Sequence, residues 1–251
     1  MTAPVYLFPD LDEYVSRSAT SVCLRGEEAR HAATVRRTRV GEEIDICDGK
    51  GLRARCVVSG VDKNELTVDV QSYEDETEIA QRWVLVQALA KGGRDEQAVD
   101  TCTEYGVHAI VPWFARRAVV SWKGKEGKRQ QRWQTIAQAA AKQSRRSFVP
   151  HVSFGMATEK LADEIREITR GGGRVYLCHE EATKPLKSFA ADIAKSPEVW
   201  VLVGPEGGIS AEECAILEEA GAQKVLLSPY VLRSSTAGAY AFATIATLVE
   251  T

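Results

Sequence analysis

The sequence lacks long apolar runs and a leader-like start. Its 251 residues are 44% hydrophobic and 27% charged, which is the composition of an ordinary globular protein. No stretch approaches the roughly 20 consecutive apolar residues that a helix needs to cross a bilayer. The start of the chain has neither a basic segment nor an apolar one, so no signal or transit peptide is predicted. We therefore expect a cytoplasmic protein with no membrane role.

Motifs for metals and common nucleotide cofactors are also missing. The six cysteines form no CxxC pair, and the four histidines stand apart. A zinc site needs such ligands at short spacings, so no metal is expected and the cysteines are predicted to be reduced thiols packed as small apolar side chains. Without a GxGxxG or Walker loop, little favours a dinucleotide or a nucleoside triphosphate.

The basic residues are unevenly distributed, although the net charge is only -3. Between positions 115 and 146, ten basic residues stand against one acid, Glu126. Such a run predicts a surface that contacts phosphates. A solvated helix face with a basic loop is the alternative, and the charge run alone does not decide between them.

The first 75 residues have the sequence pattern expected of a small β-barrel. Period-two alternation predicts short strands, and Asp48-Gly49-Lys50-Gly51 predicts a hairpin turn because glycine adopts positive φ at little cost. The acidic stretch 73–78 is the predicted linker, which places the boundary near Glu76 and gives domains 1–75 and 76–251. In the first domain we expect strands at 5–8, 43–47, 52–59 and 65–72, with a helix at 27–37.

The second domain alternates strands with helices, a pattern typical of a parallel sheet covered by helices. The expected strands are at 83–89, 108–112, 175–178, 199–203 and 224–227. The expected helices are at 95–105, 128–144, 158–170, 186–195, 211–220 and 236–249.

Three loops after the late strands are candidates for chemistry, because ligands of such sheets bind beyond the carboxyl ends of the strands. They span residues 179–181, 204–209 and 228–235, and they can build one pocket. In the second loop, three glycines around Pro205 and Glu206 let the backbone approach a ligand, although a plain tight turn is the alternative. Ser210 and Glu213 then predict a capping box that begins the next helix.

The third loop brings Arg233 to the N-terminus of the last helix, where the helix dipole disfavours a cation. A cation in that position indicates an anionic partner or a functional demand. A structural salt bridge is the alternative. The last helix is apolar enough to be buried, with another subunit as one possible partner.

At these residues the sequence resembles the RsmE-type 16S ribosomal RNA uracil-N3 methyltransferases of the SPOUT superfamily. The resemblance spans nearly the whole chain. Seven motifs in the same order carry it, and together they are highly specific. The first is His31 together with residues 35–37, and the next three are residues 48–51, 88–92 and 103–107. The fifth is Arg132-Trp133 together with residues 140–146, and the last two are residues 203–208 and 231–237.

The resemblance implies a small PUA-like β-barrel domain followed by a SPOUT α/β domain with a C-terminal trefoil knot, and a homodimer. Composition alone favours an ordinary doubly wound sheet, because threaded chains are very rare. In the third loop, Ser228 replaces a usual glycine, Tyr230 a usual arginine, and Ser235 a frequent glutamate. No carboxylate can therefore act at position 235.

The resemblance further implies that S-adenosyl-L-methionine is the cofactor and that 16S ribosomal RNA, or the small ribosomal subunit, is the partner. The expected cofactor-binding residues are Leu177, His179, Val203, Gly204, Pro205, Glu206, Gly207, Gly208, Leu227, Ser228, Val231, Leu232, Ser234, Thr236 and Ala237. The expected RNA-binding residues are Arg36, Arg37, Lys50, Arg129, Arg132, Arg145 and Arg146.

The expected function is S-adenosylmethionine-dependent methylation of N3 of one uridine in 16S ribosomal RNA. Arg233 is the candidate that stabilises negative charge on the uracil. Glu206 is the only carboxylate in the two later loops and a weak candidate base, with holding the turn as its alternative role. Two other functions stay open: a SPOUT methyltransferase that acts on a ribose 2'-hydroxyl or a tRNA base, and a non-catalytic RNA-binding ribosome assembly factor.

Overall fold

The computed structural model describes residues 3–249 of the chain. The chain folds into two compact units: Met1–Ile79 with Ala141–Val149, and Ala80–Ala140 with Pro150–Thr251. Each unit is described by itself below. The domain boundary near Glu76 stays a prediction.

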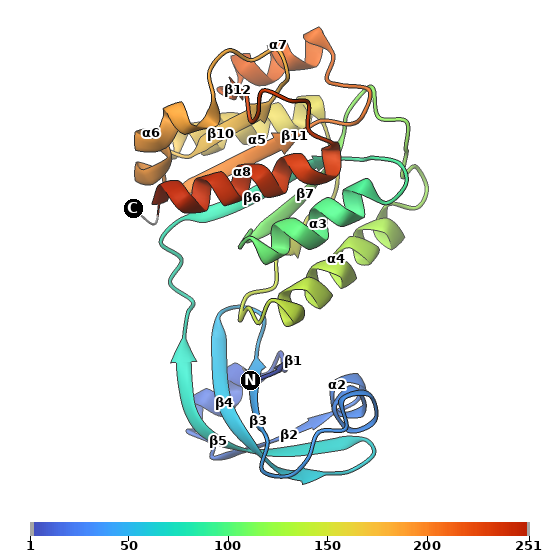
Figure 1. Cartoon of the computed structure of the whole chain (residues 1–251), viewed down its shortest axis with the longest axis vertical. Coiled ribbons are helices and arrows are strands. Elements are labelled where there is room, and N and C mark those ends of the chain that lie inside the picture. The colour runs from blue at the N-terminus through green and yellow to red at the C-terminus, as the bar shows by residue number, and fades with distance from the viewer. Residues whose placement is uncertain (1–2, 250–251) are drawn as a thin grey trace. The chain divides into compact units, whose positions relative to one another are not determined.

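The first unit is built on a five-stranded mixed sheet with the order β1-β3-β4-β5-β2 (Figure 1). All neighbouring strands are antiparallel except β1 and β3, which are parallel. This sheet is consistent with the small β-domain expected from the sequence. The strands are β1 (Val5–Leu7), β2 (Ser21–Arg25), β3 (Glu43–Cys47), β4 (Leu52–Val61) and β5 (Glu65–Asp75).

The predicted hairpin joins β3 to β4 and is confirmed. The Asp48 carboxylate accepts hydrogen bonds from the backbone N–H groups of Lys50, at 2.6 Å, and Leu52, at 3.0 Å. Gly49 and Gly51 both have positive φ. An aspartate that bonds the backbone two residues on is a usual device for closing a tight turn.

The sequence prediction missed two elements of the first unit, helix α1 (Leu11–Ser16) and strand β2. In β2, Val22 and Leu24 are buried, Cys23 between them is half-buried, and the end residues Ser21 and Arg25 are exposed, so the alternation covers only two fully buried positions. The predicted helix at 27–37 is α2 (Glu27–Arg30) followed by one π-helical segment, His31–Arg36. It ends at Arg37, whose φ is 55°.

The second unit contains a parallel sheet with the order β12-β10-β11-β6-β7-β8, and β9 pairs with β7. Every pairing in it is parallel, which confirms the prediction. The strands are β6 (Arg82–Ala88), β7 (Ala109–Phe114), β8 (His151–Val152), β9 (Met156–Ala157), β10 (Arg174–Cys178), β11 (Glu198–Val203) and β12 (Gln223–Val225).

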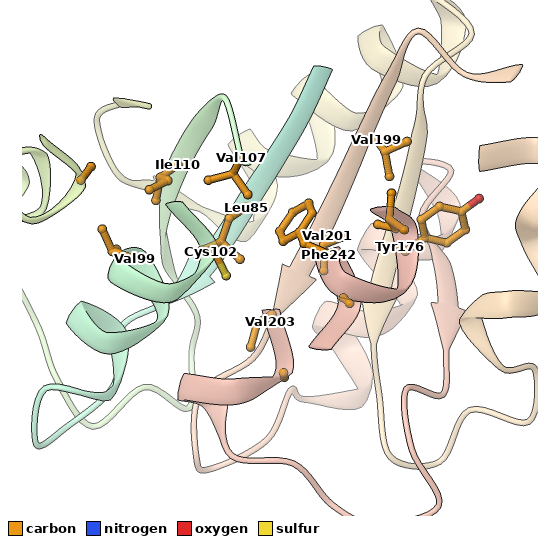
Figure 2. Close-up of a cluster of buried hydrophobic side chains, with 14 of the residues drawn as sticks. Leu85, Val99, Cys102, Val107, Ile110, Tyr176, Val199, Val201, Val203 and Phe242 are labelled. Carbon is orange, nitrogen blue, oxygen red and sulfur yellow. The ribbon is translucent and has the colours of Figure 1, made fainter. Parts of the chain in front are cut away.

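Helices cover both faces of this sheet, because alternate side chains of each strand point to opposite faces. On one face, Leu85 and Val201 pack with Cys102 of α3 and Phe242 of α8 (Figure 2). On the other, Val84 and Leu202 share a core with α5 and α7. The helices are α3 (Arg94–Glu104), α4 (Glu126–Gln143), α5 (Thr158–Arg170), α6 (Ala190–Lys195), α7 (Ala211–Glu219) and α8 (Ser234–Val249).

Most predicted elements of this unit agree with the structure to within two residues. The predicted helix at 186–195 is split into a 3₁₀ turn, Leu186–Phe189, and α6. Helix α8 begins at Ser234, two residues before the predicted start. The six cysteines are free, as expected. The trefoil knot stays a prediction.

A buried carboxylate fixes the start of α7. The Glu213 side chain accepts hydrogen bonds from the Arg116 N–H at 2.9 Å and from the Thr158 hydroxyl at 2.8 Å. It also completes the predicted capping box with Ser210, which is confirmed. Glu213 therefore connects the end of β7, the start of α5 and the start of α7.

The hydrogen bonds to Glu213 make the stability of the protein depend on pH, because they shift the pKa of this side chain. Burial acts to raise the pKa, but the hydrogen bonds from Arg116, Thr158 and Ser210 outweigh burial and lower it below the ordinary 4.5. A carboxylate with a lowered folded-state pKa contributes stability above its unfolded pKa, and that contribution is lost as the pH falls through the folded pKa.

We predict that Glu213→Gln lowers the free energy of unfolding at pH 7 by about 1.5–3 kcal/mol, the value of hydrogen bonds to a charged group. The variant should also lose less stability than the parent protein between pH 5 and pH 3, roughly the range in which a carboxylate protonates. Urea unfolding at a series of pH values measures both effects. Glu219→Gln, an exposed position on the same helix, is the control. Equal losses in both variants would contradict the prediction.

Candidate active site

The carboxyl ends of the parallel strands lie at one edge of the sheet, so the loops that follow them gather there. Three of these loops are the ones that the sequence singled out, at 179–181, 204–209 and 228–235. In the structure the first loop begins at residue 179, the second loop spans 204–210 and the third loop spans 226–233, because α8 already begins at Ser234. Two more follow β6 and β7 and were not singled out. All five belong to the second unit.

The first and third loops are joined through their backbones. The His179 N–H donates to the Val225 carbonyl at 3.1 Å, and the Leu226 N–H donates to the Lys184 carbonyl at 2.9 Å. The His179 ring accepts from the Glu181 N–H through Nδ1 at 3.2 Å. The two loops thus form one hydrogen-bonded rim in which His179 holds its own turn.

The second and third loops are joined by Ser234, the first residue of α8. Its hydroxyl donates to the Gly204 carbonyl at 3.0 Å and accepts from the Gln87 amide at 2.9 Å. Gln87 is the next-to-last residue of β6 and is fully buried. Its Oε1 atom has no hydrogen-bond partner among the described residues. A buried acceptor without a partner is unusual in proteins and points to a missing donor.

The second loop is also held from its other side, by the loops after β6 and β7. Glu206 accepts from the Lys91 N–H at 3.1 Å and from the Arg94 guanidinium at 2.8 Å. A Cβ atom on Gly207 would lie 2.8 Å from the Arg117 carbonyl oxygen. The neighbouring backbone of this chain therefore requires glycine at position 207, whether or not a ligand also approaches it.

The environment of Glu206 favours the turn-holding role that the sequence left open. Burial acts to raise the pKa of Glu206, but hydrogen bonds from the backbone and from Arg94 outweigh burial and lower it below the ordinary value. A carboxylate that is ionised and ion-paired is a weak proton acceptor. A role for Glu206 as a base stays a prediction.

Arg233 stands immediately before α8, as predicted. Its carbonyl accepts from the N–H groups of Thr236 and Ala237, at 2.9 and 3.0 Å. Its side chain is exposed, and within residues 3–249 it makes no ion pair. The structural salt bridge that was the alternative for Arg233 is thus absent from the described part of the chain, and the guanidinium is available to a ligand.

The other predicted cofactor-binding residues differ in what they expose. The side chains of Leu177, Val203 and Ala237 are in the hydrophobic cores, so only their backbone can face a ligand. Leu227 and Leu232 pack against a core while remaining partly accessible. Pro205 is buried, Ser228 accepts from the Tyr230 N–H at 3.1 Å, and Gly208, Val231 and Thr236 are exposed.

The predicted RNA-binding residues fall in both units. In the second unit, Arg129 is exposed, whereas Arg132 lies 3.2 Å from the Glu96 carboxylate. In the first, Arg36, Arg37, Lys50 and Arg145 are exposed. Arg146 is only half-exposed, and burial lowers its pKa to about 10. Arg129 is thus better placed than Arg146 to meet a phosphate.

Two further properties of residues 3–249 bear on function. No group of three or more histidine, cysteine or acidic side chains is arranged to hold one metal ion. None of the helices is both long and apolar enough to cross a membrane.

Comparison with known proteins identifies the family. The profile described as an RNA methyltransferase domain matches residues 77–246, and the profile of an RNA methyltransferase PUA domain matches residues 24–71. A ribosomal RNA small subunit methyltransferase E of Mycobacterium bovis is 40% identical over 226 residues, which cover 90% of this chain and 86% of that protein. The chain belongs to this RNA methyltransferase family.

More distant members of the RNA methyltransferase family are similar over nearly their full length. The Bacillus subtilis protein of the same name is 29% identical over 97% of this chain and 96% of its own. The solved structure of a ribosomal RNA small subunit methyltransferase E from Neisseria gonorrhoeae, bound to S-adenosyl methionine, has a TM-score of 0.85 and 26% identity and covers 98% of both chains. These matches agree with the PUA-like and SPOUT domains expected from the sequence.

The sequence analysis missed the contact between Gln87 and Ser234. It named residues of the loops after β6 and β7, as the motif 88–92 and the start of the basic run at 115, but did not assign these loops to the candidate site. Those loops could have been found, because the rule about strand ends applies to every strand of a parallel sheet. The Gln87 contact had no sequence signal, since its two partners are 147 residues apart.

We predict that Ser234→Ala lowers the free energy of unfolding by about 1–3 kcal/mol, because it removes one of the two hydrogen bonds that the buried Gln87 amide donates and the hydrogen bond to the Gly204 carbonyl. Ser235→Ala is the matched control: Ser235 is equally buried, but its hydroxyl makes no hydrogen bond within the described residues. Urea unfolding at pH 7 measures both. A Ser234→Ala variant as stable as Ser235→Ala would contradict the role of this hydroxyl.

Proposed function

We propose that the chain transfers a methyl group from S-adenosyl-L-methionine to N3 of one uridine in the 16S ribosomal RNA of the small subunit. The observation that carries the proposal is the joining of the three predicted loops at one edge of the parallel sheet, with the guanidinium of Arg233, which makes no ion pair with the described residues, beside them. Family membership and the printed names of the relatives support it.

The residues at this edge fit the cofactor. Adenosine and methionine both need backbone donors and acceptors in a shielded setting, and the glycine-rich second loop and the third loop supply such groups. The unpartnered, buried Oε1 atom of Gln87 is a further acceptor next to Gly204 and Ser234. We infer that backbone groups of Leu177, Val203 and Leu227 and of the loops hold the cofactor. Once bound, it supplies a methyl group on a positively charged sulfur.

The chain's own part in the reaction is then positioning and charge stabilisation. Holding the base and the methyl donor in line removes much of the entropic barrier. As uracil N3 gives its proton to water, negative charge grows on the ring carbonyl oxygens. The nitrogen then would form a bond to the methyl carbon as the bond between that carbon and sulfur breaks. Arg233 can stabilise that charge, because its side chain is exposed and makes no ion pair with the described residues.

A homodimer is part of the proposal. Helix α8 buries one side against α3, β6 and β11 and leaves Tyr240 46% exposed. In the third loop, Tyr230 and Val231 are 80% and 76% exposed. Exposed aromatic and branched side chains at such density favour a protein interface. A second copy would cover them next to the active site.

Two measurements on the full chain test the function. Calorimetry with S-adenosylmethionine should detect binding, and mass spectrometry of 16S ribosomal RNA after incubation should find one N3-methyluridine. A methyl group on a ribose hydroxyl, or on tRNA alone, would replace the proposed substrate. RNA binding without cofactor binding or methylation would favour an assembly factor.

We predict that Arg233→Ala keeps the dimer, the fold and most of the cofactor affinity, yet loses methyl transfer. The loss should be about 2.7–4 kcal/mol, or roughly a hundred- to thousandfold in rate, as for removal of one oxyanion-hole donor. Arg233→Lys should recover part of the rate, because a point charge cannot replace the planar guanidinium. Single-turnover methylation, sedimentation and thermal unfolding measure these effects. A destabilised variant with near-normal turnover would contradict the prediction.

We predict that neutralising two unpaired cations, Lys128→Gln with Arg129→Gln, reduces the salt dependence of RNA binding. Each phosphate contact contributes about 0.7–0.9 to the slope of log affinity against log salt, so two lost contacts lower it by roughly 1.4–1.8. Filter binding over a range of salt concentrations measures the slope. The control is Arg166→Gln with Arg170→Gln, two arginines of α5 that are paired with acids on their own helix. If both double variants gave the same slope, the basic segment 115–146 would be a solvated surface that does not contact RNA phosphates.

A further inference from the structure

A pocket of about 300 Å³ opens at the edge of the sheet beyond β6 and β7. Its lining combines the apolar and aromatic residues Leu89, Phe114, Ala118, Val120 and Trp122 with the polar residues Ser121, Lys123 and Glu126. This volume is at the lower end of the roughly 300–1,000 Å³ typical of small-molecule sites. The size fits one base with its sugar better than a larger ligand.

The aromatic side of the pocket wall is held in place by close packing. Trp122 is 3% exposed and packs edge-on against Trp133, with ring centroids 4.9 Å apart, and against Phe114, at 6.1 Å. Gly155 lies so close to the Phe114 ring that a Cβ atom would not fit there. The aromatic side of the pocket is therefore formed before any ligand binds.

The pocket lies next to the second loop. Ala118 and Arg117 are consecutive, and the Arg117 carbonyl is the group that a Cβ atom on Gly207 would meet at 2.8 Å. Leu89, another lining residue, is in the loop whose Lys91 N–H donates to Glu206. Both segments that line the pocket therefore touch the loop proposed to hold the methyl donor.

The segment of chain that supplies most of the lining carries more positive than negative charge. Lys123 and Glu126 line the pocket itself, and Arg117, Lys125, Lys128 and Arg129 belong to the same segment. These five cations are exposed and make no ion pair within residues 3–249. By contrast, Arg116 is paired with Glu159 and Glu212. A hollow with an aromatic side, in a segment that has an excess of cations, is complementary to a nucleotide, whose base is flat and whose phosphates are anionic.

We propose that this pocket receives the target pyrimidine, turned out of its stack, with the flanking phosphates on the five cations of this segment. An enzyme that modifies a base atom must expose that atom, and flipped bases are held between aromatic and apolar side chains. The inference rests on the proposed function and adds the place where the base is bound. It assigns the wall around Ala118 to substrate recognition.

The test fills the pocket with Ala118→Phe and compares it with Val119→Phe. Val119 is the adjacent residue and is 74% exposed outside the pocket. The probes are a 16S ribosomal RNA fragment that contains the target uridine and the same fragment with an abasic site in its place. The affinity for each fragment, single-turnover methyl transfer, cofactor affinity and thermal unfolding are measured for all three proteins.

The parent protein and Val119→Phe should bind the uridine fragment at least tenfold more tightly than the abasic one. Ala118→Phe should bind both fragments equally and transfer methyl groups at least tenfold more slowly, with the cofactor affinity and melting temperature of the control. If Ala118→Phe does not fold, Ala118→Val, which adds less volume, takes its place in the same comparison.

Three results would overturn the assignment: no preference of the parent protein for the uridine fragment, normal discrimination and transfer by the filled variant, or a loss of cofactor affinity in that variant alone. The last would make the pocket part of the cofactor site. Failure of the proposed function looks different, because the parent protein would then bind no cofactor or methylate no uridine.

Discussion

The parallel arrangement of the second sheet is the constraint on which the site depends. Because all its strands point the same way, each returning helix must cross a face of the sheet, and each strand must end at the same edge. Burial of Leu85, Val201 and their neighbours on one face, and of Val84 and Leu202 on the other, stabilises this arrangement. Loops separated by a hundred or more residues are thereby brought side by side without any contact specific to them.

Hydrogen bonds and ion pairs then turn a group of loops into a site of fixed shape. The second loop is held on one side by Ser234 and on the other by Lys91 and Arg94, acting on Gly204 and Glu206. Gly207 and Gly208, which follow Glu206, are exposed and carry no side chain, so a ligand can approach their backbone closely. Such preorganisation lowers the cost of ordering on binding.

Some of the cationic side chains are used in ion pairs within the chain, and others are available to a ligand. Arg53, Arg94 and Arg116 are used in ion pairs with Asp45, Glu206 and Glu212. Arg233 and the cations from Lys123 to Arg129 make no such pair in the described chain. The net charge of -3 therefore conceals a local excess of free positive charge next to the candidate site, which is where an RNA substrate needs it.

The sequence by itself determined the periodic elements, the hairpin at Asp48, the capping box at Ser210 and the family, because each depends on residues close together in the chain or on a fixed order of motifs. It did not determine the role of Glu206, the partner of Ser234 or the pocket beside Ala118. These depend on contacts between residues such as Lys91 and Glu206, 115 apart, and Gln87 and Ser234, 147 apart. Only the folded sheet, by bringing its strand ends to one edge, decides which distant side chains meet.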